Sequence, residues 1–178
     1  MIAREKYLEV IYFHDQLNKH VDEPEVFKYY LSAFLQAFRS VTFYLQAEFS
    51  EDARFGPWYA KKQQEMKTDP VLRFLNEMRR LTVHVNTPRV IGRFTVYVRD
   101  AMTAENEAMK ALIKGPDTST VNIVKPSDLP EEFLKSGDLA RVERQFYFEG
   151  YEERDLFALC LQGIFNLDRL VGEWEAFL

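Results

Sequence analysis

The stretch from Asp69 to Pro88 constrains the fold most, because both of its ends carry signals of helix boundaries. Asp69 can cap the first turn, and Pro70 occupies the first helical position, where a missing N–H costs no hydrogen bond. Pro88 disfavours helical backbone at Thr87, so the helix is expected to end near that residue. Apolar residues recur between these ends at helical spacing, namely Val71, Leu72, Phe74, Leu75, Met78, Leu81 and Val85. This pattern predicts one amphipathic helix.

The hydrophobic period changes directly after Pro88. Residues 89–99 alternate between apolar and polar side chains, which is typical of a half-buried strand. Thr118 to Lys125 and Arg144 to Gly150 are two further strand candidates. The helical period returns after Asp155 and continues to about Phe177. We therefore expect a small antiparallel sheet inserted between helices, because three strands packed on a helix are stable where an isolated hairpin is not.

The remaining helices follow from the same periodicity. They are expected at 2–20, 24–49, 58–66 and 104–114. Trp58 and Tyr59 are expected to fold back onto the bundle, and Gly163 to permit close approach of a neighbouring helix. The predicted fold is mainly α, a four- to five-helix bundle with a small inserted antiparallel sheet. It is expected to form a single domain over 1–178, with the bundle at 1–87 and 154–178 and the β-rich insertion at 88–150.

Composition limits the classes of function. The net charge of −5 argues against broad electrostatic binding to nucleic acid, although a local basic site is compatible with it. The single cysteine, Cys160, excludes an internal disulfide and a cysteine-rich metal site, and its apolar neighbours predict a buried thiol. No apolar stretch reaches membrane-spanning length, so a soluble cytoplasmic protein without a membrane partner is expected.

Common catalytic and cofactor motifs are absent from the sequence. It has neither a phosphate-binding glycine loop nor a G-x-S-x-G nucleophile motif. The three histidines, His14, His20 and His84, lack metal-ligand spacing, and none follows a glutamate at Glu-x-x-His spacing. We therefore expect no metal site and no cofactor.

Arg79, Arg80 and His84 form the most chemically suggestive group. Cleavage of RNA without metal needs a base for the attacking 2′-OH, an acid for the leaving 5′-oxygen and a cation for the charged phosphate. Histidine suits the first two roles and arginine the third. One chain supplies one such histidine, whereas a two-fold dimer whose helices meet near their C-termini would supply two. A solvated helix face with a histidine near its end is the simpler interpretation of the same residues.

The segment Arg79-Arg80-Leu81-Thr82-Val83-His84 places four residues between an arginine and a histidine. With the run Phe74 to Met78 before it, a long aromatic helix upstream and a closing helix downstream, this part of the chain resembles the HEPN superfamily (higher eukaryotes and prokaryotes nucleotide-binding). The resemblance implies a helical bundle, a homodimer and a metal-independent ribonuclease. It also implies that Arg79 and His84 are the catalytic pair and Arg80 an auxiliary phosphate contact. It does not cover residues 89–150, and Arg80 stands where the family usually has a polar residue, often Asn.

Two alternatives remain open from the sequence. On a regular helix Arg79 and His84 lie about 140° apart, whereas Arg80 and His84 lie about 40° apart, so Arg80 is the nearer partner unless the helix loosens before Pro88. The rival function is a catalytically silent bundle that binds a nucleotide or a partner protein, such as an antitoxin or a nucleotidyltransferase. If the chain does cleave nucleic acid, the substrate is expected to be RNA and not DNA, because DNA lacks the attacking 2′-OH.

Overall fold

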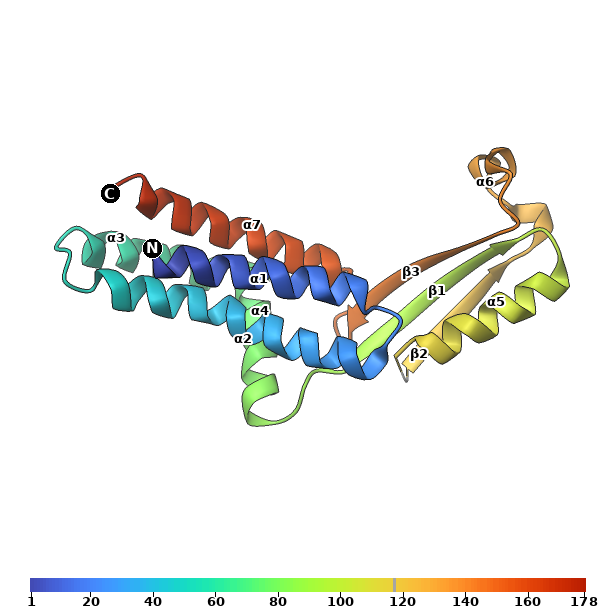
Figure 1. Ribbon diagram of the computed structural model, residues 1–178, viewed down its shortest axis with the longest axis horizontal. Helices are drawn as coiled ribbons and strands as arrows, with labels where there is room; N and C mark the ends of the chain where they lie inside the picture. Colours follow the sequence, from blue (N-terminus) through green and yellow to red (C-terminus); the bar gives the residue numbers. More distant parts are fainter. Residues whose placement is uncertain (117) are drawn as a thin grey trace. The chain divides into compact units, whose positions relative to one another are not determined.

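The structure is a computed structural model that describes residues 1–116 and 118–178. The chain is mainly helical, with a small three-stranded sheet, which confirms the predicted class (Figure 1). It divides into two compact units. The first, here called the helical unit, comprises residues 1–20, 25–88 and 157–178. The second, the sheet unit, comprises residues 21–24 and 89–156.

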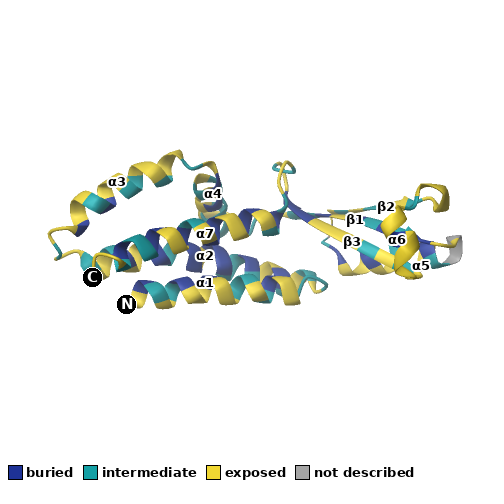
Figure 2. Ribbon diagram, turned by 90° about the horizontal axis from the view of Figure 1, so that it is seen from above, coloured by how far each residue is buried: buried dark blue, intermediate teal, exposed yellow. Residues whose placement is uncertain are grey.

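The helical unit is built mainly from five helices. Their bounds are α1 Ile2–Lys19, α2 Pro24–Phe49, α3 Phe55–Thr68, α4 Pro70–His84 and α7 Leu156–Glu175. The helices α1, α2 and α7 run alongside one another, and α4 crosses them at a steep angle (Figure 1). Helix α3 is mostly exposed or half-buried, with only Phe55 and Tyr59 buried (Figure 2). The expected helix over 58–66 is therefore longer at both ends.

The core of the helical unit lies where α2, α4 and α7 meet. Its fully buried side chains include Phe34, Leu35, Leu45, Leu75, Leu167 and Trp174. A Cβ atom built on Gly163 would lie 2.5 Å from Leu75 Cδ1 and 2.9 Å from Phe38 Cε2. The expectation that Gly163 permits close helix approach is thus confirmed. Cys160 is fully buried, as its apolar neighbours indicated.

Aromatic rings pack where α3 meets the end of α7. The Trp58 ring lies 5.0 Å from Trp174, and the Phe55 ring lies 4.9 Å from Trp174 in an edge-to-face arrangement. Tyr59 is 5% exposed. Trp58 and Tyr59 therefore fold back onto the bundle as expected, which fixes α3 despite its largely polar surface.

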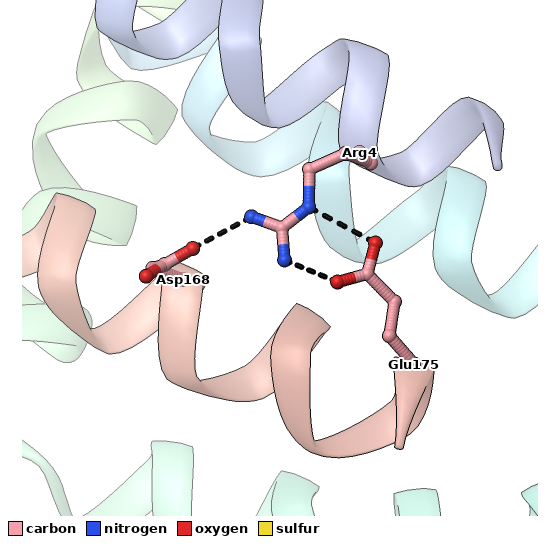
Figure 3. Close-up of polar contacts among 3 residues, drawn as sticks. All are labelled: Arg4, Asp168 and Glu175. Carbon is pink, nitrogen blue, oxygen red and sulfur yellow. Dashed lines mark hydrogen bonds and ion pairs between the residues drawn. The ribbon is translucent and has the colours of Figure 1, made fainter. Parts of the chain in front are cut away.

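A charged contact joins α1 to α7 (Figure 3). Arg4 donates through Nε to Glu175 Oε1 at 3.0 Å and through Nη1 to Asp168 Oδ1 at 2.6 Å, and its Nη2 pairs with the second Glu175 oxygen. The hydrogen bonds from Arg4 lower the pKa of Glu175, against a smaller opposing effect of burial. The guanidinium thus links the first turn of the chain to its last helix.

The sheet unit contains the three strands β1 Val90–Val98, β2 Thr118–Val124 and β3 Ala140–Phe148 in the order β2-β1-β3. Strand β1 pairs antiparallel with β3 but parallel with β2, so the expectation of an antiparallel sheet is wrong for one of its two pairings. The physical reason is the connection between β1 and β2, which holds helix α5 (Ala101–Lys114). A crossover helix returns the chain to the same end of the sheet, so the next strand runs parallel.

Other element boundaries also differ from expectation. The described residues contain seven α-helices and not four or five, because α5 and the short α6 (Glu131–Ser136) lie in the sheet unit. Pro130 and Gly137 flank α6, and Gly137 adopts the left-handed conformation after its end. None of the helices in the described residues is both long and apolar enough to cross a membrane.

Candidate functional site

Helix α4 is positioned by its N-terminal cap. The Asp69 side chain accepts a hydrogen bond from the Leu72 amide through Oδ1 at 2.8 Å, as the sequence predicted. Its second oxygen, Oδ2, accepts from Asn166 Nδ2 at 3.0 Å, which ties the start of α4 to α7. This second bond could not be predicted from local sequence, because the two residues are 97 positions apart.

Helix α4 ends earlier than expected, at His84 and not near Thr87. The amides of Val85 and Asn86 both donate to the Leu81 carbonyl, at 2.9 and 3.0 Å, which closes the last turn. The chain then leaves the helix and reaches β1 at Val90. Arg79 and His84 both lie within the helix, so the relation between them is that of a regular α-helix.

The Arg79 side chain lines an open groove between α1, α2 and α4. The groove has a volume of about 490 Å³ and is lined by Glu9, Phe13, Ala33, Gln36, Ala37, Arg39, Ser40, Phe43 and Arg79. We call it the arginine groove. Arg39 contributes the second guanidinium group of the groove. This group lies 4.2 Å from the centroid of the Phe43 ring and donates to Thr42 Oγ1 at 2.6 Å. Arg79 Nε is buried and has no hydrogen-bond partner among the described residues.

The other two predicted site residues lie outside this groove. Arg80 is exposed and forms an ion pair with Glu77 at 2.8 Å, one turn earlier on the same helix. His84 is exposed in the last turn of α4, next to the exposed side chains of Val83 and Val85. Within the described residues, no hydrogen bond, ion pair or ring contact is formed by the His84 side chain.

Regular helical geometry separates the predicted pair. Five residues at 100° each place Arg79 and His84 about 140° apart around the axis. Arg79 accordingly faces α1 and α2, whereas His84 faces outward at the end of the helix. The structure of one chain therefore does not bring Arg79 and His84 together, and Arg80 lies nearer to His84 around the helix but is paired with Glu77.

A second, smaller pocket lies on the other side of Arg39, between α2, α3, α4 and α7. Its volume is about 310 Å³, and its lining residues are Phe38, Arg39, Thr42, Tyr59, Gln63, Met66, Lys67, Leu72, Arg73, Asn76 and Leu167. We call it the basic pocket, because Arg39, Lys67 and Arg73 line it and no acidic residue does. Burial raises the pKa of the Tyr59 hydroxyl at its inner wall, although the nearby Arg39 charge opposes this.

Sequence reasoning did not identify the basic pocket. Its three cations come from three different helices and are spread over 35 positions, so no local motif contains them. Arg73 is one of the polar residues that lie between the apolar positions of the predicted helix. A signal was nevertheless present in the sequence: Arg73 and Asn76 are spaced three residues apart, which places both on one side of a helix.

The described residues contain no group of three or more His, Cys, Asp or Glu side chains arranged to hold a metal ion. At the arginine groove the lining carboxylate of Glu9 pairs with Lys6, whose Nζ lies 2.6 Å from Glu9 Oε1. On α4, Arg79, Arg80 and His84 supply guanidinium and imidazole groups. These groups can bind a phosphate and transfer a proton.

Comparison with known families gives one similarity. Residues 3–85 match the family described as bacteriophage lambda protein ea47, a stretch that extends from the first turn of α1 to the end of α4 and covers less than half of the chain. No curated protein and no solved structure matches the chain. The similarity includes Arg79, Arg80 and His84 as well as the three cations of the basic pocket, and it leaves out the whole sheet and helix α7.

Proposed function

We propose that this protein is a HEPN-like, metal-independent endoribonuclease whose site is completed by two copies of the chain. The observation that carries the proposal is that Arg79 and His84 are both available for a ligand. Arg79 has a buried Nε without a partner at an open groove, and the exposed His84 makes no side-chain contact with the rest of the described chain. Arg80, by contrast, is paired with Glu77.

The proposed reaction requires a homodimer. One chain supplies one His84, whereas the cleavage needs both a base and an acid. A two-fold axis near the C-terminal end of α4 would place His84 of one chain beside the partner's His84. Val83 is 45% exposed and Val85 is 79% exposed, so this end offers apolar surface to a second copy.

The reaction then needs only side chains of the two copies. A neutral His84 takes the proton of the 2′-OH while its oxygen attacks the phosphorus, and the bond from phosphorus to the 5′-oxygen breaks. The partner's His84, which is protonated, gives its proton to that 5′-oxygen. Arg79 stabilises the negative charge on the phosphate oxygens in the transition state. The products are a 2′,3′-cyclic phosphate and a 5′-hydroxyl, and DNA is not a substrate.

The test is incubation of the purified protein with single-stranded RNA in the presence of EDTA. We expect cleavage that leaves a 2′,3′-cyclic phosphate, abolished by His84→Ala and slowed about 10²- to 10³-fold by Arg79→Ala. Arg80→Ala should mainly weaken RNA binding and lower its salt dependence by about one phosphate contact. Inhibition by EDTA, cleavage of DNA, or full activity of the His84→Ala variant would each contradict the proposal.

The oligomeric state provides a separate test. Sedimentation of the full chain at high micromolar concentration should show a dimer, and Val85→Glu should shift it toward monomer by placing charge in the apolar contact. Glu51→Lys is a suitable control, because Glu51 is exposed in the loop between α2 and α3. A monomer at the highest concentration would exclude the composite site.

The second candidate is a catalytically silent bundle that binds a nucleotide or a partner protein, in the manner of an antitoxin or of the partner of a nucleotidyltransferase. The divergence of Arg79 and His84 within one chain favours it. RNA binding without cleavage by a protein shown to be dimeric would support this candidate over the ribonuclease.

A further inference from the structure

Three cations converge on the basic pocket from three helices. Arg39 lies in the middle of α2, Lys67 in the last turn of α3 and Arg73 in the second turn of α4. None of the three forms an ion pair within the described residues. Many other cations of the helical unit do, including Arg4 and Lys62. Neutralisation by carboxylates is therefore common in this acidic chain but is missing at this pocket.

A cluster of like charges around one pocket is unfavourable without a counter-charge. Lys67 and Arg73 are exposed and Arg39 is half-buried, so the three cations repel one another around a recess that is open to water, which screens part of this repulsion. The lining contains no Asp or Glu that could reduce it. The last-turn position of Lys67 also matches the helix dipole, but that explanation does not extend to Arg39, which is far from either end of α2.

The rest of the pocket suits a small polar ligand. Gln63 and Asn76 supply amide groups that can donate or accept hydrogen bonds, and Phe38, Met66 and Leu167 supply an apolar wall. The volume of about 310 Å³ is at the lower end of the range usual for small-molecule sites. Arginine and lysine at short range bind phosphate oxygens through charge-assisted hydrogen bonds.

We propose that the basic pocket binds the phosphate group of a small phosphorylated ligand, held by Arg39, Lys67 and Arg73. The remainder of the ligand lies against Gln63, Asn76 and the apolar wall. Arg39 also lines the arginine groove, so a ligand here contacts a residue next to the proposed catalytic arginine. The proposal goes beyond the ribonuclease and does not depend on it, because Lys67 and Arg73 have no part in the proposed cleavage.

The experiment is isothermal titration calorimetry of the full chain with three probes: inorganic phosphate, ribose 5-phosphate and ribose. Ribose 5-phosphate should bind with one site per chain and inorganic phosphate more weakly, whereas ribose up to about 10 mM should not bind. The affinity should fall as salt rises, because the attraction is electrostatic. An affinity for ribose equal to that for ribose 5-phosphate would overturn the assignment to phosphate.

Variants locate the site. Lys67→Gln combined with Arg73→Gln should weaken ribose 5-phosphate binding at least about tenfold, since two charge-assisted bonds to the phosphate are lost. Lys61→Gln is the matched control, because Lys61 is an exposed lysine of α3 that does not line the pocket. The side chains of Lys67 and Arg73 make no hydrogen bond or ion pair within the described residues, so both substitutions should preserve the fold. If the double variant fails to fold, Lys67→Gln alone serves, with an expected loss of at least threefold.

The phosphate could also belong to a polynucleotide backbone, and a fourth titration separates the two sources. A short single-stranded RNA without a terminal phosphate is titrated into the wild type and the double variant. Binding of this RNA that depends on Lys67 and Arg73, with no binding of ribose 5-phosphate, would overturn the small-ligand proposal. Equal binding of ribose 5-phosphate by the wild type and the double variant, or no binding by the wild type, would also overturn it.

Discussion

At Gly163 the lack of a side chain allows α7 to contact α2 and α4 directly. An added Cβ would meet Leu75 Cδ1 at 2.5 Å and Phe38 Cε2 at 2.9 Å, both shorter than normal contact. Gly163→Ala should therefore lower the free energy of unfolding by about 1–3 kcal/mol, as is usual for overpacking a core. Chemical denaturation monitored by circular dichroism measures this difference.

Gly172 provides the control on the same helix. An added Cβ there would meet only Arg4 Nη2 at 3.8 Å, which is an ordinary contact. Gly172→Ala should therefore raise the free energy of unfolding by about 0.5–1 kcal/mol, because alanine is the better helix former. If both substitutions stabilise the protein to the same extent, the close contact at Gly163 is not present in solution.

His14 makes the stability of the helical unit dependent on pH. Its ring lies 6.2 Å from the Phe34 ring and 6.0 Å from the Phe157 ring, and its Nε2 is buried without a hydrogen-bond partner in the described residues. Burial lowers the pKa of His14 from its ordinary value of 6.5, and the charge of Asp15 opposes this only in part. The unfolded chain thus binds a proton at this position at a higher pH than the folded chain does. Stability should be highest above pH 6.5 and should fall as the pH decreases below it.

His14→Gln tests this dependence, because glutamine does not titrate. Between about pH 7 and pH 5, thermal unfolding should show a smaller loss of stability for His14→Gln than for the wild type. His20→Gln is the comparison variant, because it removes a histidine whose ring stacks on Tyr30 at 5.1 Å and keeps His14. If His14→Gln and the wild type lose stability in parallel, His14 is not the group that titrates.

At the level of elements, one carboxylate, that of Asp69, holds the N-terminal end of α4 in place. Asp69 caps α4 through the Leu72 amide and accepts a second hydrogen bond from Asn166 on α7. Asp69→Ala removes both bonds and should lower the free energy of unfolding by about 1–3 kcal/mol. Urea denaturation monitored by tryptophan fluorescence measures the change, since Trp58 and Trp174 report on the packed helical unit.

Asp69→Asn separates the cap from the charge. Its side-chain oxygen can still accept from Leu72, and an amide rotation at Asn166 can restore the second bond. The loss should therefore be clearly smaller than for Asp69→Ala. An equal loss in the two variants would mean that the negative charge, and not the hydrogen bonds, stabilises this end of α4.

At the level of the whole molecule, the chain enters the sheet at Arg89 and leaves it at Glu149, and these two residues are neighbours in space. The Glu149 amide donates to the Arg89 carbonyl at 3.0 Å. A short glycine- and serine-rich linker in place of residues 90–148 should therefore leave the helical unit folded. The replacement removes the ion pairs of Asp22 with Lys114 and Arg144, each worth up to about 1 kcal/mol. Circular dichroism should show a higher helical content per residue and cooperative unfolding.

The same linker in place of α3 is the contrasting replacement. It removes the buried side chains of Phe55 and Tyr59 and the ring contacts of Trp58 with Trp174. This variant should lose cooperative unfolding, although it deletes far fewer residues. If the shortened chain without residues 90–148 also fails to fold, the helical unit requires the sheet unit for its stability.

Local signals in the sequence determined most of the elements. The cap at Asp69, the proline at position 70 and the apolar spacing predicted α4, and alternation predicted β1 within one residue at each end. These predictions hold because capping and burial periodicity act between residues that are close in the chain. The end of α4 and the parallel pairing of β2 were predicted wrongly, because each depends on where the chain goes next.

The candidate site divides in the same way. The sequence by itself identified Arg79, Arg80 and His84 as the chemically notable group of α4, and their roles and the homodimer remain predictions. Only the tertiary structure decided that Arg79 lines a groove with Arg39 and that Arg80 forms an ion pair with Glu77. It also decided that Lys67 and Arg73 line a pocket with Arg39 and that no carboxylate lines it. The physical reason is that a side chain's direction follows from its own helix, whereas the groups it meets are set by how α1, α2, α3, α4 and α7 pack against one another.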